Sequence, residues 1–263
     1  MSTILDKIID HKKKELAELK SNKSTDEVKK CVKNCQREPM DISFFDALNK
    51  KGSINIIAEV KKGSPSKGII CEDFDPVSIA KQYEIAGAGA VSVLTDSHFF
   101  FGKLQYLKDI RKAISLPILR KDFIIDEYQI YEAKCAGANA ILLIAAVLDK
   151  DTIQEFLDIA RKLDLDALVE VHNKSELDKV LKTDARIIGV NNRNLKDFSV
   201  DLNTTAELVK DIPPGKVVVS ESGIHTRADI EQVLSCGVNS FLIGEALVKD
   251  NQMAGKMAEF LGK

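Results

Sequence analysis

Five short apolar stretches of this sequence each end in side chains that can donate or accept protons. The stretches are IIAEV, LPILR, ALVEV, IIGVN and VVVSE, and the polar residues at their ends are Glu59, Lys61, Lys121, Asp122, Glu170, Asn191, Arg193, Glu221 and Ser222. A single charged residue can simply reach solvent where a chain leaves the core. Lysines and glutamates that lie together shift one another's pKa values, and proteins obtain catalytic acids and bases in this way. If the fold brings the five ends together, the pattern predicts general acid–base chemistry.

The residues after the first stretch do not form a nucleotide-binding loop. Lys61 is followed by KGSPSKG, with Gly68 at its end. A phosphate loop of that type requires Gly-x-x-x-x-Gly followed by Lys and Ser or Thr, whereas Ile69 and Ile70 follow Gly68. Glu59 and Lys61 alternate along the strand and therefore point to the same side, which makes them candidates for one edge of a site.

From residue 54 onward, short runs rich in Val and Ile alternate with amphipathic helical stretches. We expect strands near residues 54–60, 90–95, 116–120, 140–145, 167–171, 186–191, 216–220 and 239–243. We expect helices at 76–86, 103–113, 126–136, 149–163, 174–181, 202–210 and 226–236, and a last helix that ends near 261. Gly87, Gly137 and Gly237 follow predicted helices, where glycine adopts the left-handed conformation that ends a helix.

Eight strand–helix units predict an α/β fold of the (βα)8 type, a TIM barrel. The chain has 263 residues, and such barrels typically have about 250. The strands are almost continuously apolar, as a parallel sheet buried on both faces requires. An open doubly wound sheet is the alternative, but its usual Gly-x-Gly-x-x-Gly motif is absent after the first strand. In a barrel the carboxyl ends of all strands meet at one mouth, where the polar ends would gather.

Residues 1–50 form, in our interpretation, a helical N-terminal extension that caps a single barrel domain spanning 1–263. Apolar residues at helical spacing begin at Ile4, and Ser24 with Glu27 can form a capping box before a second helix near 28–35. A third helical segment covers 41–49. The run from His11 to Lys14 is flanked by acidic residues, so we interpret it as the solvated face of the first helix.

Two glycines late in the chain lie where a barrel binds phosphate. Gly223, in ESGI, and Gly244, in LIGEAL, follow the seventh and eighth strands. Backbone N–H groups in these loops bind phosphate oxygens in many barrels, and glycine lets the backbone approach closely. The alternative is that each glycine only forms a tight turn. The pair of positions favours a phosphate site.

Neither the histidines nor the aromatic residues indicate a cofactor. His11, His98, His172 and His225 lack the spacing or the carboxylate companions of a metal site, and we interpret them as surface or loop residues. We expect no metal and no cofactor. The cluster from Phe99 to Phe101 follows the second strand; it can pack against a planar substrate or belong to the core under the N-terminal helices.

Composition predicts a cytoplasmic protein with a small-molecule partner. The 38 basic and 40 acidic residues nearly balance, so no overall charge favours nucleic acid or an acidic membrane surface. Five cysteines, at 31, 35, 71, 135 and 236, are an odd number without metal-site spacing, which is typical of free thiols in a reducing compartment. The start lacks the apolar segment of a signal peptide, and the longest uncharged run, 135–148, is too short to cross a bilayer.

Six segments resemble, in chain order, the signature segments of the indole-3-glycerol phosphate synthase family. They are AEVKKGSPSKG, LPILRKDFIID, LVEVHN, IIGVNNRNL, SESGI and FLIGEAL, and the N-terminal ILDKIIDHKKKEL resembles the first helix of that family. The likeness covers nearly the whole chain. Other phosphate-binding barrels share the last two segments but not the first three. One departure is Gly63, where relatives often carry a side chain, and this bears on the stiffness of the loop.

The resemblance implies a carboxy-lyase of tryptophan biosynthesis. Its substrate would be 1-(2-carboxyphenylamino)-1-deoxyribulose 5-phosphate, and its products indole-3-glycerol phosphate, carbon dioxide and water. The resemblance implies that Lys121 protonates the ketone oxygen, that Glu170 is the base, and that Lys61, held by Glu59, is a second acid. It also implies contacts of Asn191, Arg193 and Glu221 with the substrate carboxylate and hydroxyls, of Ser64 in the loop, of Phe100 and Phe123 with the aromatic ring, and of Ser222, Gly223, Gly244 and the Glu245 backbone with phosphate. Contact with other tryptophan-pathway enzymes is possible.

Two other functions fit parts of the pattern. A sugar-phosphate isomerase barrel, such as phosphoribosylanthranilate isomerase or a histidine-pathway isomerase, uses an acid/base pair, but its chemistry does not require both Lys61 and Lys121. A non-catalytic barrel that binds a phosphorylated metabolite and regulates a partner would bind phosphate ligands, and replacing Lys121 or Glu170 would change only its affinity.

Overall fold

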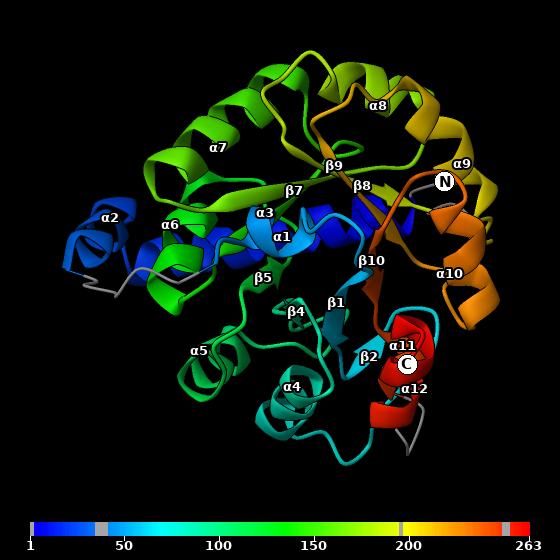
Figure 1. Cartoon of the computed structure of the whole chain (residues 1–263). Helices are drawn as coiled ribbons and strands as arrows, with labels where there is room; N and C mark the ends of the chain where they lie inside the picture. Colours follow the sequence, from blue (N-terminus) through cyan, green and yellow to red (C-terminus); the bar gives the residue numbers. More distant parts are fainter. Residues whose placement is uncertain (1–2, 35–41, 195–196, 249–252) are drawn as a thin grey trace.

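Eight parallel strands form a closed barrel in the computed structural model, which describes residues 3–34, 42–194, 197–248 and 253–263 (Figure 1). The strands are β1 (Asn55–Val60), β4 (Ala90–Leu94), β5 (Ile118–Lys121), β6 (Ala140–Ile144), β7 (Asp166–Val171), β8 (Ile187–Asn191), β9 (Val217–Glu221) and β10 (Ser240–Ile243). Around the ring they follow the order β1, β10, β9, β8, β7, β6, β5, β4, and β1 pairs in parallel with both β10 and β4. The predicted (βα)8 barrel is confirmed, and the open sheet is wrong because the first and last strands pair.

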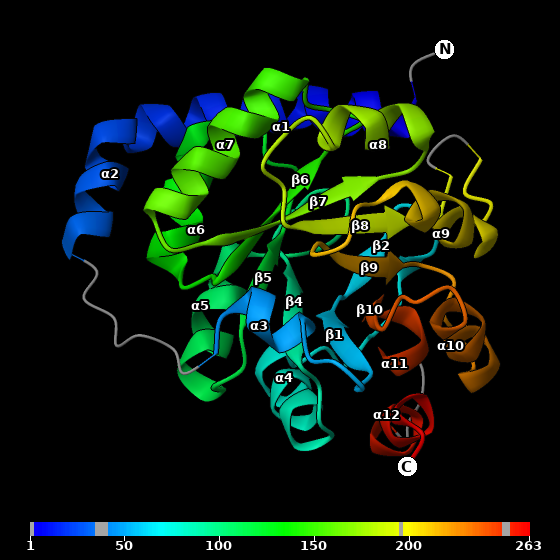
Figure 2. The same ribbon diagram turned by 45° about the horizontal axis from the view of Figure 1, so that its top comes forward.

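Helices surround the barrel on its outside (Figure 2). They are α4 (Pro76–Ile85), α5 (Leu104–Ala113), α6 (Glu127–Ala136), α7 (Lys150–Lys162), α8 (Lys174–Val180), α9 (Asn203–Leu208) with the 3-10 turn η1 (Val209–Asp211), α10 (Arg227–Leu234) and α12 (Met253–Leu261). Most begin at a side chain that accepts from the first free N–H groups, as Asp149 does for α7. Gly87, Gly137 and Gly237 all have positive φ, as predicted for helix ends. The sequence missed a hairpin of β2 (Gly63–Ser64) and β3 (Gly68–Ile69), and the short α11 (Glu245–Val248).

The N-terminal helices contact both ends of the barrel. They are α1 (Ile4–Asn22), α2 (Thr25–Asn34) and α3 (Phe44–Leu48). The predicted capping box is present, since the Ser24 N–H donates to Glu27 and the Glu27 N–H donates to Ser24. Lys29 of α2 forms an ion pair with Glu127 of α6 at 2.8 Å. The first turns of α1 lie at the mouth formed by the carboxyl ends of the strands, whereas α3 packs at the amino end.

One sequence interpretation is wrong for Lys12. Lys13 and Lys14 are exposed, as a solvated helix face requires, but the Lys12 side chain lies inside the protein and is 2% exposed. A run of lysines gives no sign of this, because only the packing of α1 against the barrel determines which of them turns inward.

The core has two parts, as expected for a barrel whose sheet is buried on both faces. One lies between the strands and the surrounding helices. The other fills the barrel, and there Phe44 and Leu48 of α3 pack against Ile57 and Leu119 from the strands. All residues of β1, β4 and β6 are buried, which explains why the sequence shows these strands as mainly apolar runs.

In the part of the chain that the structure describes, Cys31, Cys71, Cys135 and Cys236 form no disulfide, as predicted. Cys35 lies outside the described residues. In the described part of the chain, none of the helices has the length and apolar character needed to cross a bilayer.

We predict that Leu48→Ala lowers the free energy of unfolding by about 2–5 kcal/mol, because it opens a cavity at a fully buried position. Ile85→Ala is the matched control: Ile85 is 86% exposed, so its truncation should change that free energy by no more than about 0.5 kcal/mol. Urea unfolding followed by circular dichroism measures both. Equal effects of the two substitutions would contradict the proposed role of α3 in the core.

Candidate active site

A cavity of about 180 Å³ lies at the carboxyl ends of the strands. Every residue that the sequence analysis placed at the site lines it: Glu59, Lys61, Ser64, Phe100, Lys121, Phe123, Glu170, Asn191, Arg193, Glu221, Ser222, Gly223, Gly244 and Glu245. Ile4, Leu5 and Ile8 of α1 line it as well. The closed barrel thus brings together residues that are up to 186 positions apart, from Glu59 to Glu245.

Lys121 lies between two buried carboxylates. Its Nζ is 3.6 Å from Glu170 Oε2 and 3.6 Å from Glu221 Oε2. Lys121 ends β5 and Glu221 ends β9, and these strands are opposite each other in the ring. The Lys121 ammonium group therefore reaches across the mouth of the barrel.

Glu59 and Lys61 form a second ion pair at the edge of the same cavity. Lys61 Nζ is 2.6 Å from Glu59 Oε2. Burial alone would raise the pKa of Glu59, but the charges of Lys61 and Lys121 hold it below its ordinary value. Glu59 is therefore a carboxylate at neutral pH and holds Lys61 beside the site.

The two glutamates around Lys121 have opposite pKa shifts. Burial would raise the pKa of Glu170, but Lys121 and His172 outweigh it and lower that pKa. Burial raises the pKa of Glu221, and the adjacent charge of Glu170 raises it further. The charges of Glu170, Glu221 and Glu59 in turn raise the pKa of Lys121 well above its ordinary value, against the effect of burial. At neutral pH, Glu170 can therefore act as an ionised base and Lys121 as a charged acid. A proton shared by the two glutamates lies mainly on Glu221.

The cavity has an apolar wall and, opposite it, a loop wall. Phe100 and Phe123 follow β4 and β5, with ring centroids 5.9 Å apart. Across the mouth, Ser222 and Gly223 follow β9 and both have positive φ, of 64° and 86°. Such a cavity can bind a molecule that has an aromatic ring at one end and an anionic group at the other.

The loop after β1 closes one side of the cavity. Ser64 and Ser66 line it, and Lys67 forms an ion pair with Glu245 of α11. A Cβ on Gly63 would lie 2.5 Å from the Gly68 carbonyl oxygen and 2.7 Å from the Phe101 ring. The departure at Gly63 thus has a structural reason, since the hairpin and Phe101 leave no room for a side chain.

Comparisons with known proteins agree with this geometry. Residues 5–260 match the family model described as indole-3-glycerol phosphate synthase. The chain is 49% identical over 256 residues to the indole-3-glycerol phosphate synthase of Alkaliphilus metalliredigens (strain QYMF), covering 97% of each chain. It is 44% identical over 259 residues to that of Sulfurimonas denitrificans, covering 98% of each. The chain belongs to the indole-3-glycerol phosphate synthase family.

Solved structures outside the indole-3-glycerol phosphate synthase family share the fold. An N-acetylmannosamine-6-phosphate 2-epimerase from Clostridium perfringens has a TM-score of 0.63 at 16% identity and covers 86% of this chain and all of its own length. A 3-hexulose-6-phosphate synthase has a TM-score of 0.65 at 14% identity and covers 79% of this chain and 98% of its own. At such identities the likeness shows the barrel alone.

Two glycines make room for the carboxylates of this indole-3-glycerol phosphate synthase family member. A Cβ on Gly189 would lie 2.0 Å from Glu221 Oε1, and a Cβ on Gly244 would lie 2.3 Å from Glu59 Oε2. The sequence analysis assigned Gly244 to phosphate and did not single out Gly189. Both contacts are between neighbouring strands, so sequence spacing alone does not reveal them.

Sequence reasoning missed the role of His172, which it interpreted as a loop residue. Its Nε2 is 3.3 Å from Glu170 Oε1, and its Nδ1 is 3.1 Å from Glu176 Oε2. Burial would lower the pKa of His172, but hydrogen bonding and charge from the two glutamates raise it to about 10. His172 is therefore a cation that lies against Glu170. His172 directly follows β7, two residues after Glu170, and side chains two apart in an extended chain point to the same side; this alternation was the available signal.

The role of Asn192 was also missed, because the sequence analysis assigned only its neighbour Asn191 to the site. Its buried amide donates to the carbonyl oxygens of Glu221 and Ser222 at 3.0 and 3.1 Å. Its oxygen accepts from the Thr205 hydroxyl at 2.8 Å. Asn192 thus fixes the start of the loop that carries Ser222 and Gly223, while Asn191 faces the cavity.

In the described residues, no group of three or more His, Cys, Asp or Glu side chains could hold a metal ion. His11 and His98 instead stack, with ring centroids 4.1 Å apart, and Phe99 packs edge-on against both. Of the three phenylalanines after the second strand, Phe99 thus lies under α1, whereas Phe100 lines the cavity.

We predict that Gly189→Ala lowers turnover about 10²-fold, because the new methyl group displaces the Glu221 carboxyl group and small misplacements at a reacting centre cost this much. Gly89→Ala is the control, since the nearest atom to its added Cβ lies at 3.5 Å. Steady-state kinetics and circular dichroism measure activity and folding. Normal turnover in a folded Gly189→Ala variant would contradict the packing argument.

We predict that His172→Gln removes stability in a pH-dependent way. The pKa of His172 rises from its ordinary value near 6.5 to about 10 in the folded protein, so its stabilisation is complete below pH 6.5 and is lost as pH rises toward 10. The difference in melting temperature between the native protein and the variant should therefore shrink over this range. His225→Gln, at an exposed position, serves as the control. A difference that stays constant from pH 6 to pH 10 would disprove the ion pair.

Proposed function

We propose that this protein is an indole-3-glycerol phosphate synthase. It closes the indole ring of 1-(2-carboxyphenylamino)-1-deoxyribulose 5-phosphate with loss of carbon dioxide and water, in tryptophan biosynthesis. The observation that carries the proposal is the position of Lys121, 3.6 Å from both Glu170 and Glu221, in a cavity with an aromatic wall on one side. Family membership supports the same reaction.

Ring closure begins with attack of the ring carbon that bears the carboxylate on the ketone carbon. Negative charge then develops on the ketone oxygen, and a fixed cation nearby stabilises it and supplies a proton. Lys121 suits this role because three carboxylates keep it charged. The new carbon–carbon bond forms, the ketone oxygen becomes a hydroxyl group, and loss of carbon dioxide returns an electron pair to the ring.

The second half of the reaction removes that hydroxyl group as water. An acid must protonate the leaving oxygen and a base must accept a proton from the ring system. Among the described residues, Lys61 and Lys121 are the two lysines that line the cavity, and Glu170 is the base because its lowered pKa keeps it ionised. Glu221 Oε1 is buried and makes no hydrogen bond within the described residues, so it is free to accept from a substrate hydroxyl.

The substrate lies, in this proposal, with its ring against Phe100 and Phe123 and its phosphate at the opposite wall. Ser222, Gly223, Gly244 and the backbone of Glu245 bind the phosphate, while Asn191, Arg193 and Ser64 contact the carboxylate and hydroxyl groups. Support comes from the lining of the cavity, in which all of these residues take part, and from the positive φ of Ser222 and Gly223.

We further infer that the protein acts in the cytoplasm as one domain, with residues 1–50 as its helical extension. The cysteines of the described residues, which form no disulfide, and the contribution of α1 to the cavity support this inference. Its partner is a small phosphorylated substrate. We also infer contact with other enzymes of tryptophan biosynthesis, because the next enzyme of the pathway uses indole-3-glycerol phosphate.

The test is a fluorescence time course with the carboxyphenylamino substrate, excited in the indole band. The chain has no Trp and four Tyr, so an indole signal stands out. We predict a rising signal that Lys121→Ala slows about 10²–10⁴-fold, the usual worth of a general acid. Lys112→Ala, at a side chain that is 76% exposed, should match the native rate.

A flat trace from folded native protein would reject ring closure and favour the isomerase chemistry. Near-normal turnover of Lys121→Ala would reject the role of Lys121. Binding of glycerol 3-phosphate by this variant, measured by calorimetry, separates a lost catalytic group from a lost fold, because the phosphate wall lies across the mouth.

A further inference from the structure

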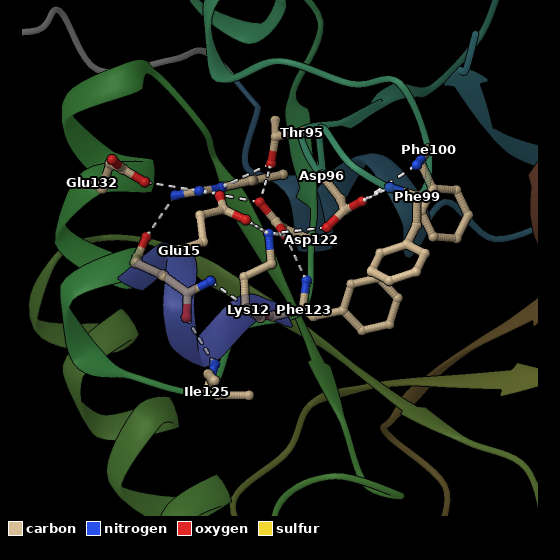
Figure 3. A network of polar contacts seen from close by, with 12 residues as sticks. Lys12, Glu15, Thr95, Asp96, Phe99, Phe100, Asp122, Phe123, Ile125 and Glu132 are labelled. Atoms are coloured by element: carbon tan, nitrogen blue, oxygen red, sulfur yellow. Dashed lines mark hydrogen bonds and ion pairs between the residues drawn. The ribbon is translucent and has the colours of Figure 1, made fainter. Parts of the chain in front are cut away.

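Lys12 of α1 is a buried cation outside the catalytic cluster, surrounded by three carboxylates (Figure 3). Its Nζ lies 2.9 Å from Glu15 Oε2, 3.1 Å from Asp96 Oδ2 and 3.0 Å from Asp122 Oδ1. Burying an ammonium group costs several kcal/mol unless charges of opposite sign compensate it. The position of Lys12 therefore has to be explained by what the carboxylates do.

Asp96 organises the loop that carries Phe100. It is fully buried after β4, and its Oδ1 accepts from the backbone N–H groups of Phe99 at 2.8 Å and Phe100 at 3.3 Å. Among the described residues, Lys12 is the one cation that forms an ion pair with Asp96, and Oδ2 makes no hydrogen bond. The conformation of this loop thus depends on a carboxylate whose counter-ion comes from α1.

Asp122 has a second source of compensation. Its Oδ2 lies 3.2 Å from Arg120 Nη2 and accepts from the Thr95 hydroxyl at 2.5 Å, and its Oδ1 accepts from the Phe123 N–H. Burial alone would raise the pKa of Asp122, but Arg120 and Lys12 lower it to about 2. Without Lys12, Asp122 would still have a cation, whereas Asp96 would have none.

The same contacts link α1 to the apolar wall of the cavity. Ile4, Leu5 and Ile8 lie one to two turns before Lys12 on α1 and line the cavity together with Phe100 and Phe123. Lys12 therefore connects three parts of that wall, namely α1, the loop after β4 and the loop after β5. The Lys12 ion pairs are with Glu15, Asp96 and Asp122, whereas those of Lys61 and Lys121 are with Glu59, Glu170 and Glu221, so Lys12 does not belong to the acid–base cluster.

We propose that Lys12 is a positioning residue of the active site: through Asp96 it holds Phe100, and with it the wall that receives the aromatic ring of the substrate. The identity of that ring rests on the proposed function. Removal of the cation leaves an uncompensated buried carboxylate, which costs more than the pair itself contributes. Rearrangement of the loop from Asp96 to Gly102 brings Asp96 to water and displaces Phe100.

Lys12→Met and the double variant Lys12→Met with Asp96→Asn separate this role from a general loss of stability. Methionine has similar length and a good helix propensity. Asparagine at 96 retains an oxygen that can accept from Phe99 and Phe100, without the excess charge. Lys13→Met is the matched control, because the Lys13 side chain is 67% exposed.

The first measurement is hydrogen exchange of ligand-free protein in the segment 95–103, which needs no assumption about the substrate. We expect Lys12→Met to accelerate exchange at Phe99 and Phe100 about tenfold or more, since it weakens their hydrogen bonds to Asp96. The double variant should recover most of the protection, and residues 140–144 of β6 should not change. Unchanged exchange in the single variant would overturn the proposal.

The second measurement compares two ligands by calorimetry. Indole-3-glycerol phosphate has a ring and a phosphate, whereas glycerol 3-phosphate has the phosphate alone. Lys12→Met should raise the dissociation constant of the first about tenfold, the scale of a lost aromatic contact, and that of the second less than about twofold. The double variant should again approach the native values. Equal weakening of both ligands, or a double variant that remains as weak as Lys12→Met, would show that Lys12 serves stability alone.

Failure of the proposed function would give a different result. Native protein that binds the two ligands equally and yields no indole signal would reject ring closure. Accelerated exchange in Lys12→Met, recovered in the double variant, would even then support the Lys12–Asp96 link to Phe100, and unchanged exchange would reject it.

Discussion

The compensation of three buried glutamates by two lysines is the interaction on which the site depends. Glu59, Glu170 and Glu221 are all almost completely buried at the mouth of the barrel. Carboxylates in such a position are tolerated only with cations close by, and Lys121 reaches across the ring to supply one. Closure of the eight strands makes this possible, since it brings β5 and β9 face to face. Neighbouring charges and burial together set the pKa values: the cations lower the pKa of Glu59 and Glu170 against the effect of burial, whereas burial and the charge of Glu170 raise the pKa of Glu221.

Side chains alternate in direction along a strand, so neighbouring residues at a strand end serve two functions: one faces the cavity and the next holds the surrounding structure. Lys121 faces the cavity, while Arg120 and Asp122 on either side of it form the buried pair that contacts Thr95 and, through Asp122, the helix α1. In the same way Asn191 faces the cavity and its neighbour Asn192 turns back to hold the loop after β9. The residues next to those that face the cavity thus hold the surrounding loops and α1, because consecutive residues of an extended chain point to opposite sides.

Much of this was predictable from sequence, for a physical reason. A strand buried on both faces must be apolar, so Lys121 or Glu170 at its end is conspicuous, and barrel closure then determines where these ends meet. Residues whose role depends on contacts between elements gave no such signal. Lys12 was wrongly interpreted as solvated, because a lysine run on a helix shows the same pattern whether or not one member turns inward. In the sequence, Gly189 looks like any other glycine in a strand. Its role becomes visible only in the structure, where the Glu221 carboxyl group lies beside it.

The first helix, α1, does more than cover the mouth of the barrel. The mouth of the barrel gathers charges, and Ile4, Leu5 and Ile8 supply apolar surface on the side of Phe100 and Phe123. That surface is useful only if α1 docks in one position, and apolar contacts alone are not directional. An ammonium group between Asp96 and Asp122 is directional, because it must lie within about 3 Å of both carboxylates. The buried lysine thus gives the helix a single docking position on the same two loops that carry Phe100 and Phe123.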